Sequence, residues 1–444
     1  MTQVEFEYFL NHFKLYYNVP DNITISYGDD RNADILIKKS IRADFQDFDE
    51  NMLKKMVWKE WLGTSIPFLF DDTDTPIFSY NPKQIIINYD IIAAGFYLLS
   101  SVQETDHRLQ DHMGRFQYAA SIQHKLNITQ TPVVNYYFDI LKKAIEERGK
   151  LELKNRVFSA YSLSVCLTHD IDNTENAWIE GGFSALKKGK LLTLLSLFYA
   201  KWVKGIDKWF NFEDILNLEK SFGVHSTFYF LPQKTTKGGP KNADYDIIHK
   251  KFQGVFKEIL SNGSEIGVHG SIGTSLNADK LKDDIRKIPV PVKGVRFHFL
   301  QYQPGLTAEV IETAGLKYDT TLGFAEHIGF RNSFCYPFFS YDFSKQKASN
   351  VLEIPLAIMD ATLYNKSYMG LTTQESKRQV INLFDEVQKF NGLVTILWHN
   401  TFFSPYKYNG WRAVYEHILE YATQHNVGIH TAENIYENVT NHNR

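Results

Sequence analysis

Residues 163–172 have the sequence Leu-Ser-Val-Cys-Leu-Thr-His-Asp-Ile-Asp. The first half is largely apolar and predicts a short buried strand, Leu163–Leu167. If the strand continues, Asp170 and Asp172 point to the same side, because successive side chains of a strand alternate. Two carboxylates on one face repel each other unless a cation lies near them, so the pair suits one metal ligand and one general base. The same pair is equally common in an Asx turn that closes a strand.

Beyond this stretch, strands and helices are predicted to alternate. The later predicted strands are Ser226–Phe230, Glu265–Val268, Val295–Phe299, Val351–Ile354 and Leu393–Trp398. The predicted helices are Phe212–Phe222, Tyr245–Leu260, Thr307–Ala314 and Glu375–Phe390. This alternation is typical of parallel strands joined by crossover helices, in an open sheet or a barrel. In such α/β folds the chemistry lies at the carboxyl ends of the strands.

Three of the later strands end in side chains that bind metals or carry protons. His269 ends the third strand, and alternation puts Arg296 and His298 on one face of the fourth. His399 follows the apolar run of the last strand. A buried arginine is costly unless a carboxylate lies near it, and the aspartates of the first strand would supply one. Each residue has an ordinary structural explanation alone, but together they indicate a hydrolytic site.

The first third of the chain has a different pattern. Ile85–Ile87 predicts a short strand, and helices are predicted at Ile91–Leu99 and from about Tyr136 to Glu147. Residues 148–155 are charged and poor in apolar side chains, so we place a domain boundary near residue 155. We expect a mixed α/β domain of unknown role over residues 1–155 and a second domain over residues 156–444.

Composition narrows the class of protein. The 444 residues include 48 Lys+Arg and 51 Asp+Glu, and the net charge of −3 argues against a protein that coats nucleic acid. Two cysteines, Cys166 and Cys335, lie in apolar surroundings and are too few for a disulfide framework. Residues 1–7 carry two acids and no basic signal-peptide region, and no stretch has the ~18 uncharged apolar residues of a spanning helix. We therefore expect a cytoplasmic protein without a transmembrane segment.

One segment departs from the rhythm of strands and helices. Residues 181–210 contain six lysines, at 187, 188, 190, 201, 204 and 208, and one acid, Asp207. Apolar residues between the lysines fall mostly at helical spacing. The simplest interpretation is a helix that packs on the barrel and exposes its lysines to solvent. A membrane-surface helix, or a basic patch for the diphosphate of a substrate, remains an alternative.

Several motifs together resemble the polysaccharide deacetylase family, whose catalytic part is the NodB-homology domain. They are Thr-His-Asp-Ile-Asp at 168–172, Glu-Ile-Gly-Val-His-Gly-Ser at 265–271, Gly-Val-Arg-Phe-His-Phe-Leu at 294–300 and Leu-Trp-His-Asn at 397–400. Further matches are Tyr-Asp-Thr-Thr-Leu-Gly-Phe at 318–324, Gly-Phe-Arg at 329–331, Leu-Glu-Ile-Pro-Leu at 352–356 and Met-Asp at 359–360. The resemblance covers residues 160–440, and the N-terminal part looks like an uncharacterised domain that precedes this one in a bacterial subgroup.

The resemblance implies a distorted (β/α) TIM-like barrel that removes an acyl group from an N-acylated amino sugar with one divalent metal. By position, Asp170 resembles the family's general base and Asp172 its metal-binding aspartate. His269 matches the first metal-binding histidine, Arg296 the residue that holds the base, and His399 the general acid. Neighbours of these motifs are expected to contact the substrate, namely Trp398, Asn400 and Ser271.

The sequence departs from the family at one metal ligand. The family's second metal histidine lies four residues after the first, where this chain has Gly273. A catalytic zinc ion normally has three protein ligands and a water, so a third ligand is needed, and His298 is our candidate. We predict a zinc-dependent deacetylase of an amino sugar in a glycan or glycan precursor, acting in surface polysaccharide metabolism. The alternatives are a catalytically silent glycan-binding or scaffold protein, which Gly273 favours, and a hydrolase of a different amide.

Overall fold

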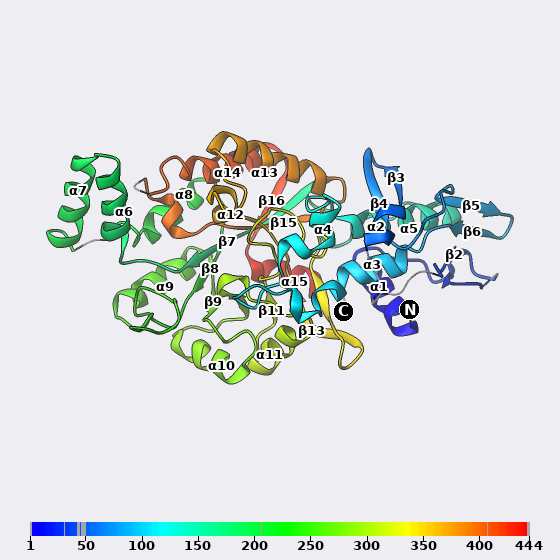
Figure 1. Cartoon of the computed structure of the whole chain (residues 1–444), viewed down its shortest axis with the longest axis horizontal. Helices are drawn as coiled ribbons and strands as arrows, with labels where there is room; N and C mark the ends of the chain where they lie inside the picture. Colours follow the sequence, from blue (N-terminus) through cyan, green and yellow to red (C-terminus); the bar gives the residue numbers. More distant parts are fainter. Residues whose placement is uncertain are drawn as a thin grey trace.

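The structure is a computed structural model that describes residues 2–30, 32–41, 45, 50–205, 207–405 and 407–441. Figure 1 shows the N-terminal elements at one end of the molecule and a long helical hairpin, α6 and α7, at the other. Between them lies a large twisted sheet with helices packed around it. The described strands form this ten-stranded sheet and two small sheets of four and two strands.

The N-terminal elements surround the four-stranded sheet, whose order is β1-β2-β6-β5. The strands of this sheet are β1 (Ile25–Tyr27), β2 (Ile35–Ile37), β5 (Phe78–Asn81) and β6 (Gln84–Ile87). A separate two-stranded hairpin is formed by β3 (Val57–Trp61) and β4 (Thr64–Phe68). The helices are α1 (Gln3–Tyr16), α2 (Glu50–Lys55), α3 (Ile91–Leu99), α4 (Ile122–Lys125) and α5 (Val133–Gly149). Helix α1 begins at a capping box between Thr2 and Glu5, which satisfies backbone donors of its first turn. Helix α3 is buried throughout, as expected of an almost wholly apolar helix.

The large sheet begins with the stretch quoted first. Its strands are β7 (Leu163–Ile171), β8 (Thr227–Phe230), β9 (Glu265–Gly270), β10 (Gly294–Phe297), β11 (Tyr318–Asp319), β12 (Phe338–Asp342), β13 (Lys347–Glu353), β14 (Leu356–Met359), β15 (Leu393–Leu397) and β16 (Val427–His430). The order is β12-β13-β11-β10-β9-β8-β7-β15-β14, and β16 also pairs with β7. All pairs are parallel except β12–β13.

Helices connect most of these strands. They are α6 (Ala177–Lys187), α7 (Leu191–Trp202), α8 (Phe212–Ser221), α9 (Lys251–Ser261), α10 (Ala278–Lys287), α11 (Leu306–Ala314), α12 (Asp360–Tyr364), α13 (Thr373–Gln388), α14 (Arg412–Gln424) and α15 (Ala432–Asn441). The predicted alternation of strands and crossover helices is therefore confirmed as a mixed α/β fold. Among the described residues, no helix is both long and apolar enough to cross a bilayer.

The large sheet curls until its two ends approach each other. Strand β13 pairs with β11 near one end of the sheet, and β14 pairs with β15 at the other. Only Ile354 and Pro355 separate β13 from β14. A proline has no N–H for a strand ladder, which accounts for the break at this point. The predicted TIM-like barrel is thus found as a curled sheet, and in the described part of the chain no strand pairing closes it into a complete barrel.

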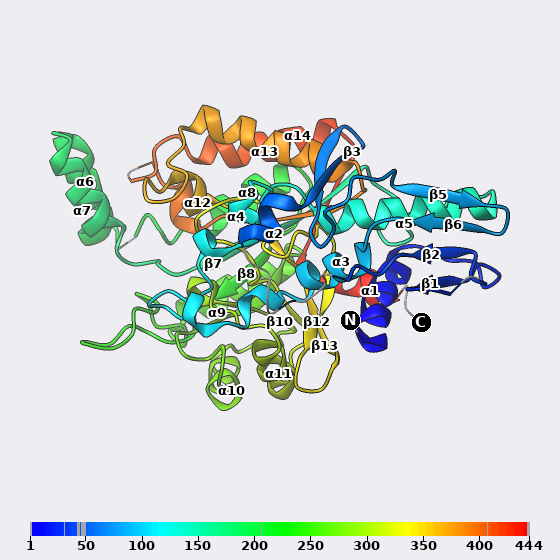
Figure 2. The same cartoon turned by 45° about the vertical axis from the view of Figure 1, so that its right-hand side comes forward.

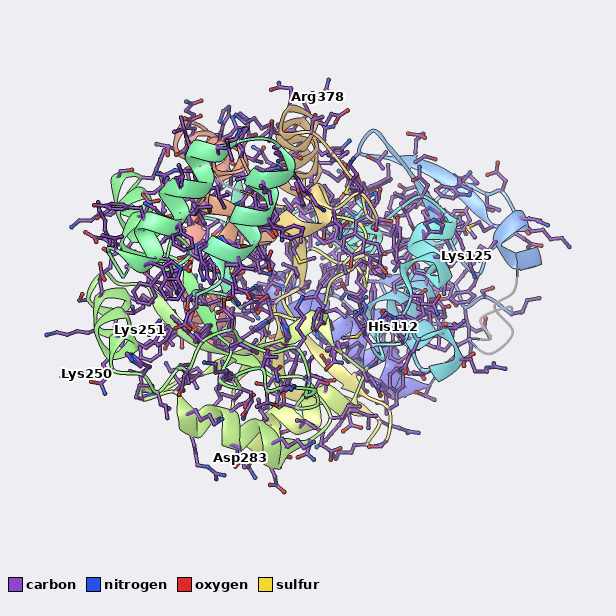
Figure 3. All side chains as sticks on the ribbon, turned by 60° about the vertical axis from the view of Figure 1, so that its left-hand side comes forward. His112, Lys125, Lys250, Lys251, Asp283 and Arg378 are labelled. Atoms are coloured by element: carbon purple, nitrogen blue, oxygen red, sulfur yellow. The ribbon has the colours of Figure 1, made fainter. Side chains whose placement is uncertain are left out.

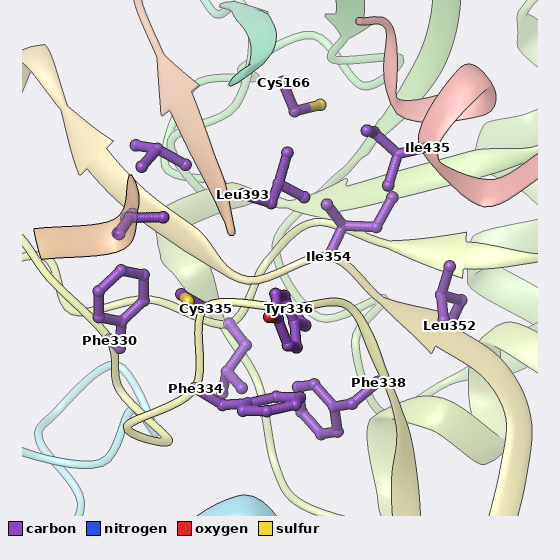
Figure 4. Close-up of a cluster of buried hydrophobic side chains, with 14 of the residues drawn as sticks. Cys166, Phe330, Phe334, Cys335, Tyr336, Phe338, Leu352, Ile354, Leu393 and Ile435 are labelled. Atoms are coloured by element: carbon purple, nitrogen blue, oxygen red, sulfur yellow. The ribbon is translucent and has the colours of Figure 1, made fainter. Parts of the chain in front are cut away.

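One hydrophobic core joins the N-terminal elements to the large sheet. Figure 4 shows part of it, where Cys166 of β7 lies near the ring-rich stretch that contains Cys335 and Tyr336. Both cysteines are buried and unpaired. Helix α1 is bound to the same stretch, since the Tyr8 hydroxyl donates to the Phe339 carbonyl at 2.7 Å. The division into residues 1–155 and 156–444 remains a prediction.

Some predicted elements have different bounds or positions. The fourth strand ends at Phe297 rather than Phe299, and the helix predicted from Tyr245 begins at Lys251. In the large sheet, β11, β12, β14 and β16 were not predicted, and in the N-terminal part neither were β1 to β5. The segment 181–210 does not pack on the sheet as expected: α6 and α7 pack on each other and project from the molecule in both Figure 1 and Figure 2.

Candidate metal centre and acid–base site

The site is built at the carboxyl end of β7, where a buried arginine binds Asp170. The side chain of Arg296, from β10, has no exposed surface. Its Nη1 donates to Thr168 Oγ1 at 2.6 Å and to Asp170 Oδ1 at 3.2 Å. Its Nε donates to the Thr320 carbonyl at 3.0 Å, and the guanidinium lies 5.0 Å from the centre of the Tyr229 ring. These contacts fix the arginine in one orientation, so it holds the Asp170 carboxylate in place.

His269 lies beside Arg296 because β9 and β10 pair with these two residues in register. The His269 Nδ1–H donates to the Arg296 carbonyl at 2.8 Å. This bond directs the other ring nitrogen, Nε2, toward the two aspartates, 3.3 Å from Asp172 Oδ1 and 3.6 Å from Asp170 Oδ2. A carbonyl that accepts from one ring nitrogen and so orients the other is the usual support of a metal-binding histidine.

His298 directly follows β10 on the same face as Arg296, and a strained turn comes immediately after it. The strand β10 ends at Phe297, and the next residues form a short 3-10 turn in which Phe299 has φ 58° and Leu300 has φ 55°. Residues other than glycine seldom adopt this left-handed region, and such strain is often found at functional sites. The His298 Nε2–H donates to the Lys241 carbonyl at 3.2 Å. Its Nδ1 then faces His269 Nε2 at 3.1 Å.

Three ligand atoms therefore converge, Asp172 Oδ1, His269 Nε2 and His298 Nδ1, all within 4.8 Å of one another. The separations are 3.1 Å between the two nitrogens and 3.3 and 3.7 Å from them to the carboxylate oxygen. A tetrahedral zinc ion with bonds of about 2.0–2.1 Å requires its ligand atoms to be roughly 3.3–3.4 Å apart. Asp172 Oδ1 is also buried without a hydrogen bond of ordinary geometry. The residues present thus fit a divalent metal.

The local charges favour the metal-binding forms of Asp172 and His298. Burial raises the pKa of Asp172, but the surrounding histidines outweigh burial and hold that pKa well below its usual range. Burial lowers the pKa of His298 to about 4, which leaves the ring neutral and its Nδ1 lone pair free at neutral pH. Burial lowers the pKa of His269, but Asp170 and Asp172 outweigh burial and raise it above its ordinary value, so a metal would compete with a proton for this ring.

On the other side of Asp172 lies a second histidine–carboxylate pair. His399 Nδ1 donates to Asp360 Oδ1 at 2.7 Å, and the backbone N–H of His399 donates to Asp360 Oδ2 at 2.5 Å. His399 Nε2 lies 3.7 Å from Asp172 Oδ2. Burial lowers the pKa of His399, but Asp360 and then Asp172 outweigh burial and raise it to about 10. His399 therefore carries a proton at neutral pH and can donate it from Nε2.

The role of Asp360 was not predicted, although the Met-Asp pair at 359–360 was among the matching motifs. Asp360 is fully buried and directly follows the four apolar residues of β14. A carboxylate at the end of an apolar strand is the same signal that singled out Asp170. Because β14 is short and is separated from β13 by Pro355, the sequence pattern did not show it as a strand of its own.

The three residues predicted to contact substrate are all buried in the structure, and their contact with substrate stays a prediction. Trp398 is fully buried and packs against Phe402, Trp411 and Tyr415, so it offers no ring face to a ligand. Asn400 donates to the Asn173 and Trp209 carbonyls, and Ser271 N–H donates to Asp284 of α10. All three stabilise the loops around the site.

The N-terminal part of the chain also reaches the site, and the sequence did not predict this. Arg115 pairs with Asp111 through Nη2 at 2.7 Å, and its Nη1 contacts the Phe299 carbonyl at 3.4 Å. Gln301 Nε2 donates to the Met113 carbonyl at 2.9 Å. The polar cluster around residues 111–116 therefore supports the strained turn that follows His298.

Comparisons with known proteins match the two parts of the chain separately. Residues 1–150 match a family of unknown function, DUF7033, and no curated protein matches the chain. Among solved structures, a protein described as a polysaccharide deacetylase from Mycobacterium smegmatis is 15% identical, with 64% of this chain and 92% of that chain covered and a TM-score of 0.41. A protein described as a polysaccharide deacetylase from Pseudomonas aeruginosa is 13% identical, with 63% and 91% covered and a TM-score of 0.41.

An allantoinase structure is similar to the same degree, at 14% identity, with 63% of this chain and 91% of that chain covered and a TM-score of 0.42. At such identities and TM-scores these neighbours do not assign an activity to this chain. The function proposed below therefore rests on the residues of the site.

Proposed function

We propose that this protein is a metal-dependent hydrolase that removes an N-acetyl group from an amino sugar in a glycan or glycan precursor. The observation that carries the proposal is the triangle of ligand atoms from Asp172, His269 and His298, placed between a clamped carboxylate and a protonated histidine. The motif resemblance over residues 160–440 supports the sugar substrate. The family has its second metal-binding histidine where this chain has Gly273. In this chain His298, just after the neighbouring strand β10, would take the place of that ligand.

Each residue of the site has its own role in the proposed reaction. Asp172, His269 and His298 would hold a divalent metal, which supplies polarisation of the acyl carbonyl and a lower pKa for a bound water. Asp170 accepts a proton from the attacking water, and Arg296 holds that carboxylate in place. His399 donates its Nε2 proton to the leaving amine, and Asp360 holds the ring in the required tautomer. The products are acetate and a free amino sugar.

Metal content is the most direct test of the site. We expect the purified protein, dialysed against zinc and then against metal-free buffer, to retain about one zinc ion per chain. His298→Ala should lose most of it, because the two remaining ligands are too few for a tight catalytic site. The matched control His249→Ala changes an exposed histidine and should retain the metal. A wild type that holds no metal under these conditions contradicts the proposal and favours the silent glycan-binding protein.

Acetate release tests the reaction itself. We expect the zinc-loaded protein to release acetate from oligomers of N-acetylglucosamine or from a nucleotide-linked N-acetyl amino sugar. Metal retention without acetate release, but with release of ammonia or another acid from a different amide, would favour the broader amidohydrolase. Chelator should stop turnover, and added zinc should restore it.

A further inference from the structure

The helical hairpin α6–α7 presents a continuous apolar stripe to solvent. On α7 the stripe consists of Leu191, Leu192, Leu195, Phe198, Tyr199, Trp202 and, just beyond its end, Val203. These positions recur every three to four residues and so share one face of the helix. Leu192 is 84% exposed and Trp202 62% exposed. Phe183 and Leu186 of α6 are exposed as well. Single exposed apolar residues are ordinary, but a stripe of this length marks a binding surface.

The hairpin turns a different face inward. Leu197 and Ala200 of α7 are buried, and Gly182 of α6 leaves room for Leu194, whose Cδ1 lies 3.1 Å from where a Cβ would stand. In both Figure 1 and Figure 2 the hairpin extends beyond the rest of the molecule, so no other element covers the stripe. Figure 3 brings this end forward and shows side chains extending from both helices. The two helices thus need only each other for packing, and the outer stripe has no partner within the described chain.

Lysines stand at both ends of the stripe. Lys187, Lys188 and Lys190 are exposed at the turn between the helices, and Lys204 and Lys208 are exposed beyond the end of α7. The nitrogen of Lys187 lies 5.2 Å from the Phe183 ring centre, and that of Lys204 lies 5.6 Å from the Tyr199 ring centre. Long side chains that cover rings with their stems and keep their charge outside suit the boundary between water and lipid.

Residues 181–210 carry one acid, and the exposed Glu180 of α6 just before them is paired with Lys407. Asp207, the single acid of residues 181–210, is buried at the base of the hairpin. Its Oδ1 accepts from the backbone N–H groups of Ala177 and Trp209, which brings the two ends of the hairpin together, and its Oδ2 lies 3.5 Å from Lys201. The exposed charge around the stripe is therefore strongly positive. It complements the negative surface of a membrane that contains anionic lipids.

We propose that the α6–α7 hairpin docks this protein on the surface of an anionic lipid bilayer, with the apolar stripe inserted among the headgroups and the lysines paired with lipid phosphates. Lysines alone would suffice for a free diphosphate, but the stripe of leucines and aromatic rings needs an apolar phase to enter. Only residues 173–176 separate Asp172 from α6. Docking would therefore bring the rim of the candidate site close to the bilayer.

Vesicle sedimentation with the full chain tests the proposal. We expect binding to vesicles of phosphatidylglycerol and phosphatidylcholine, with at least tenfold weaker binding to pure phosphatidylcholine or at high salt. Changing Leu192, Leu195 and Phe198 to Ser should weaken binding at least tenfold, and so should changing Lys187, Lys188 and Lys190 to Ser. The matched control changes three exposed apolar residues on other faces, Ile248→Ser, Leu260→Ser and Leu276→Ser, and should bind as the wild type does.

Two results would overturn the proposal. One is equal binding to neutral and anionic vesicles, or none to either. The other is a dimer in light scattering that the Leu192, Leu195 and Phe198 changes dissociate, because the stripe is then an interface between two copies of the chain. Zinc content and acetate release from a soluble substrate should stay unchanged in every hairpin variant, so failure of docking is distinguishable from failure of the proposed function.

Discussion

At the scale of single residues, a change at Asp170 should impair catalysis without removing the metal. Asn at this position keeps the shape of the side chain and can still accept from Arg296, but it cannot take a proton from water. We expect Asp170→Asn to lower kcat by about 10²–10⁴ or more while zinc content stays near that of the wild type. Asp172→Asn is the matched comparison and should lose metal as well as activity. Unchanged turnover in Asp170→Asn would contradict the assignment of the base.

Asp360 is expected to act only through His399, which a double-mutant cycle can show. Asp360→Asn should lower kcat about tenfold to a hundredfold, because the imidazole loses the partner that keeps it protonated and oriented. In a His399→Ala background the same change should have almost no further effect. If the two effects multiply instead, Asp360 has a role of its own in the reaction.

The catalytic and metal-binding roles of the site residues stay predictions, but the structure shows where the chain places these side chains. Asp170, Asp172, His269, Arg296, His298 and His399 are brought together. Strand alternation explains Asp170, Arg296 and His298, because the extended backbone at Phe297 (φ −82°, ψ 135°) keeps His298 on the face of Arg296. The left-handed turn at Phe299 and Leu300 follows His298, and no periodic pattern encodes such a turn. A tryptophan beside a catalytic histidine can equally be a core residue, and the burial of Trp398 shows that its ring packs in the core.

At the scale of elements, length alone did not decide which elements were predicted. Helices α1 and α14, with 14 and 13 residues, were not predicted, whereas the four-residue strand β8 was. Helix α3 has the predicted bounds, and α13 differs from its prediction by only two residues at each end. Strand β11 has two residues, too few to show a pattern. The α6–α7 hairpin was predicted as helical, but its position was wrong, because an apolar stripe by itself does not say whether protein or lipid covers it.

One buried ion pair joins the N-terminal part of the chain to the loop between β11 and β12. Arg331 donates to Glu104 through Nε at 2.9 Å and through Nη2 at 2.6 Å, and both side chains are almost fully buried. We expect Glu104→Ala to lower the free energy of unfolding by about 3–5 kcal/mol, because it leaves a buried guanidinium without its carboxylate. Urea unfolding monitored by circular dichroism measures the loss. The double variant Glu104→Ala, Arg331→Met should regain part of it, and a single variant as stable as the wild type would show that the pair contributes nothing.

At the scale of the whole molecule, a buried acid connects several strands and the C-terminal helix at the end of the sheet opposite the site. Glu265 begins β9, accepts from Thr227 of β8 at 2.7 Å and from the Glu433 N–H of α15 at 2.9 Å, and bonds the Tyr318 hydroxyl of β11. Residues at this end of a parallel sheet serve stability rather than catalysis. The acid therefore connects the sheet to the C-terminal helix, and its protonation state affects the stability of the fold.

Protonation of Glu265 makes the free energy of unfolding depend on pH. Burial raises the pKa of Glu265 to about 7 from its ordinary value of 4.5, so between these values the folded chain holds a proton that the unfolded chain releases. The stability contributed is complete below about pH 4 and is lost as the pH rises toward 7, with a slope of at most about 1.4 kcal/mol per pH unit for this group. Urea unfolding at pH 5, 6 and 7 should show this fall in stability. The buffer contains chelator, because metal binding would otherwise displace protons from the ligands and add its own pH dependence. Asp319, Asp71 and Asp244 also have raised pKa values and add to the fall. Glu265→Gln should therefore make the slope shallower without abolishing it, whereas the exposed control Glu258→Gln should leave the slope unchanged. Equal slopes in wild type and Glu265→Gln would mean that Glu265 is ionised throughout this range.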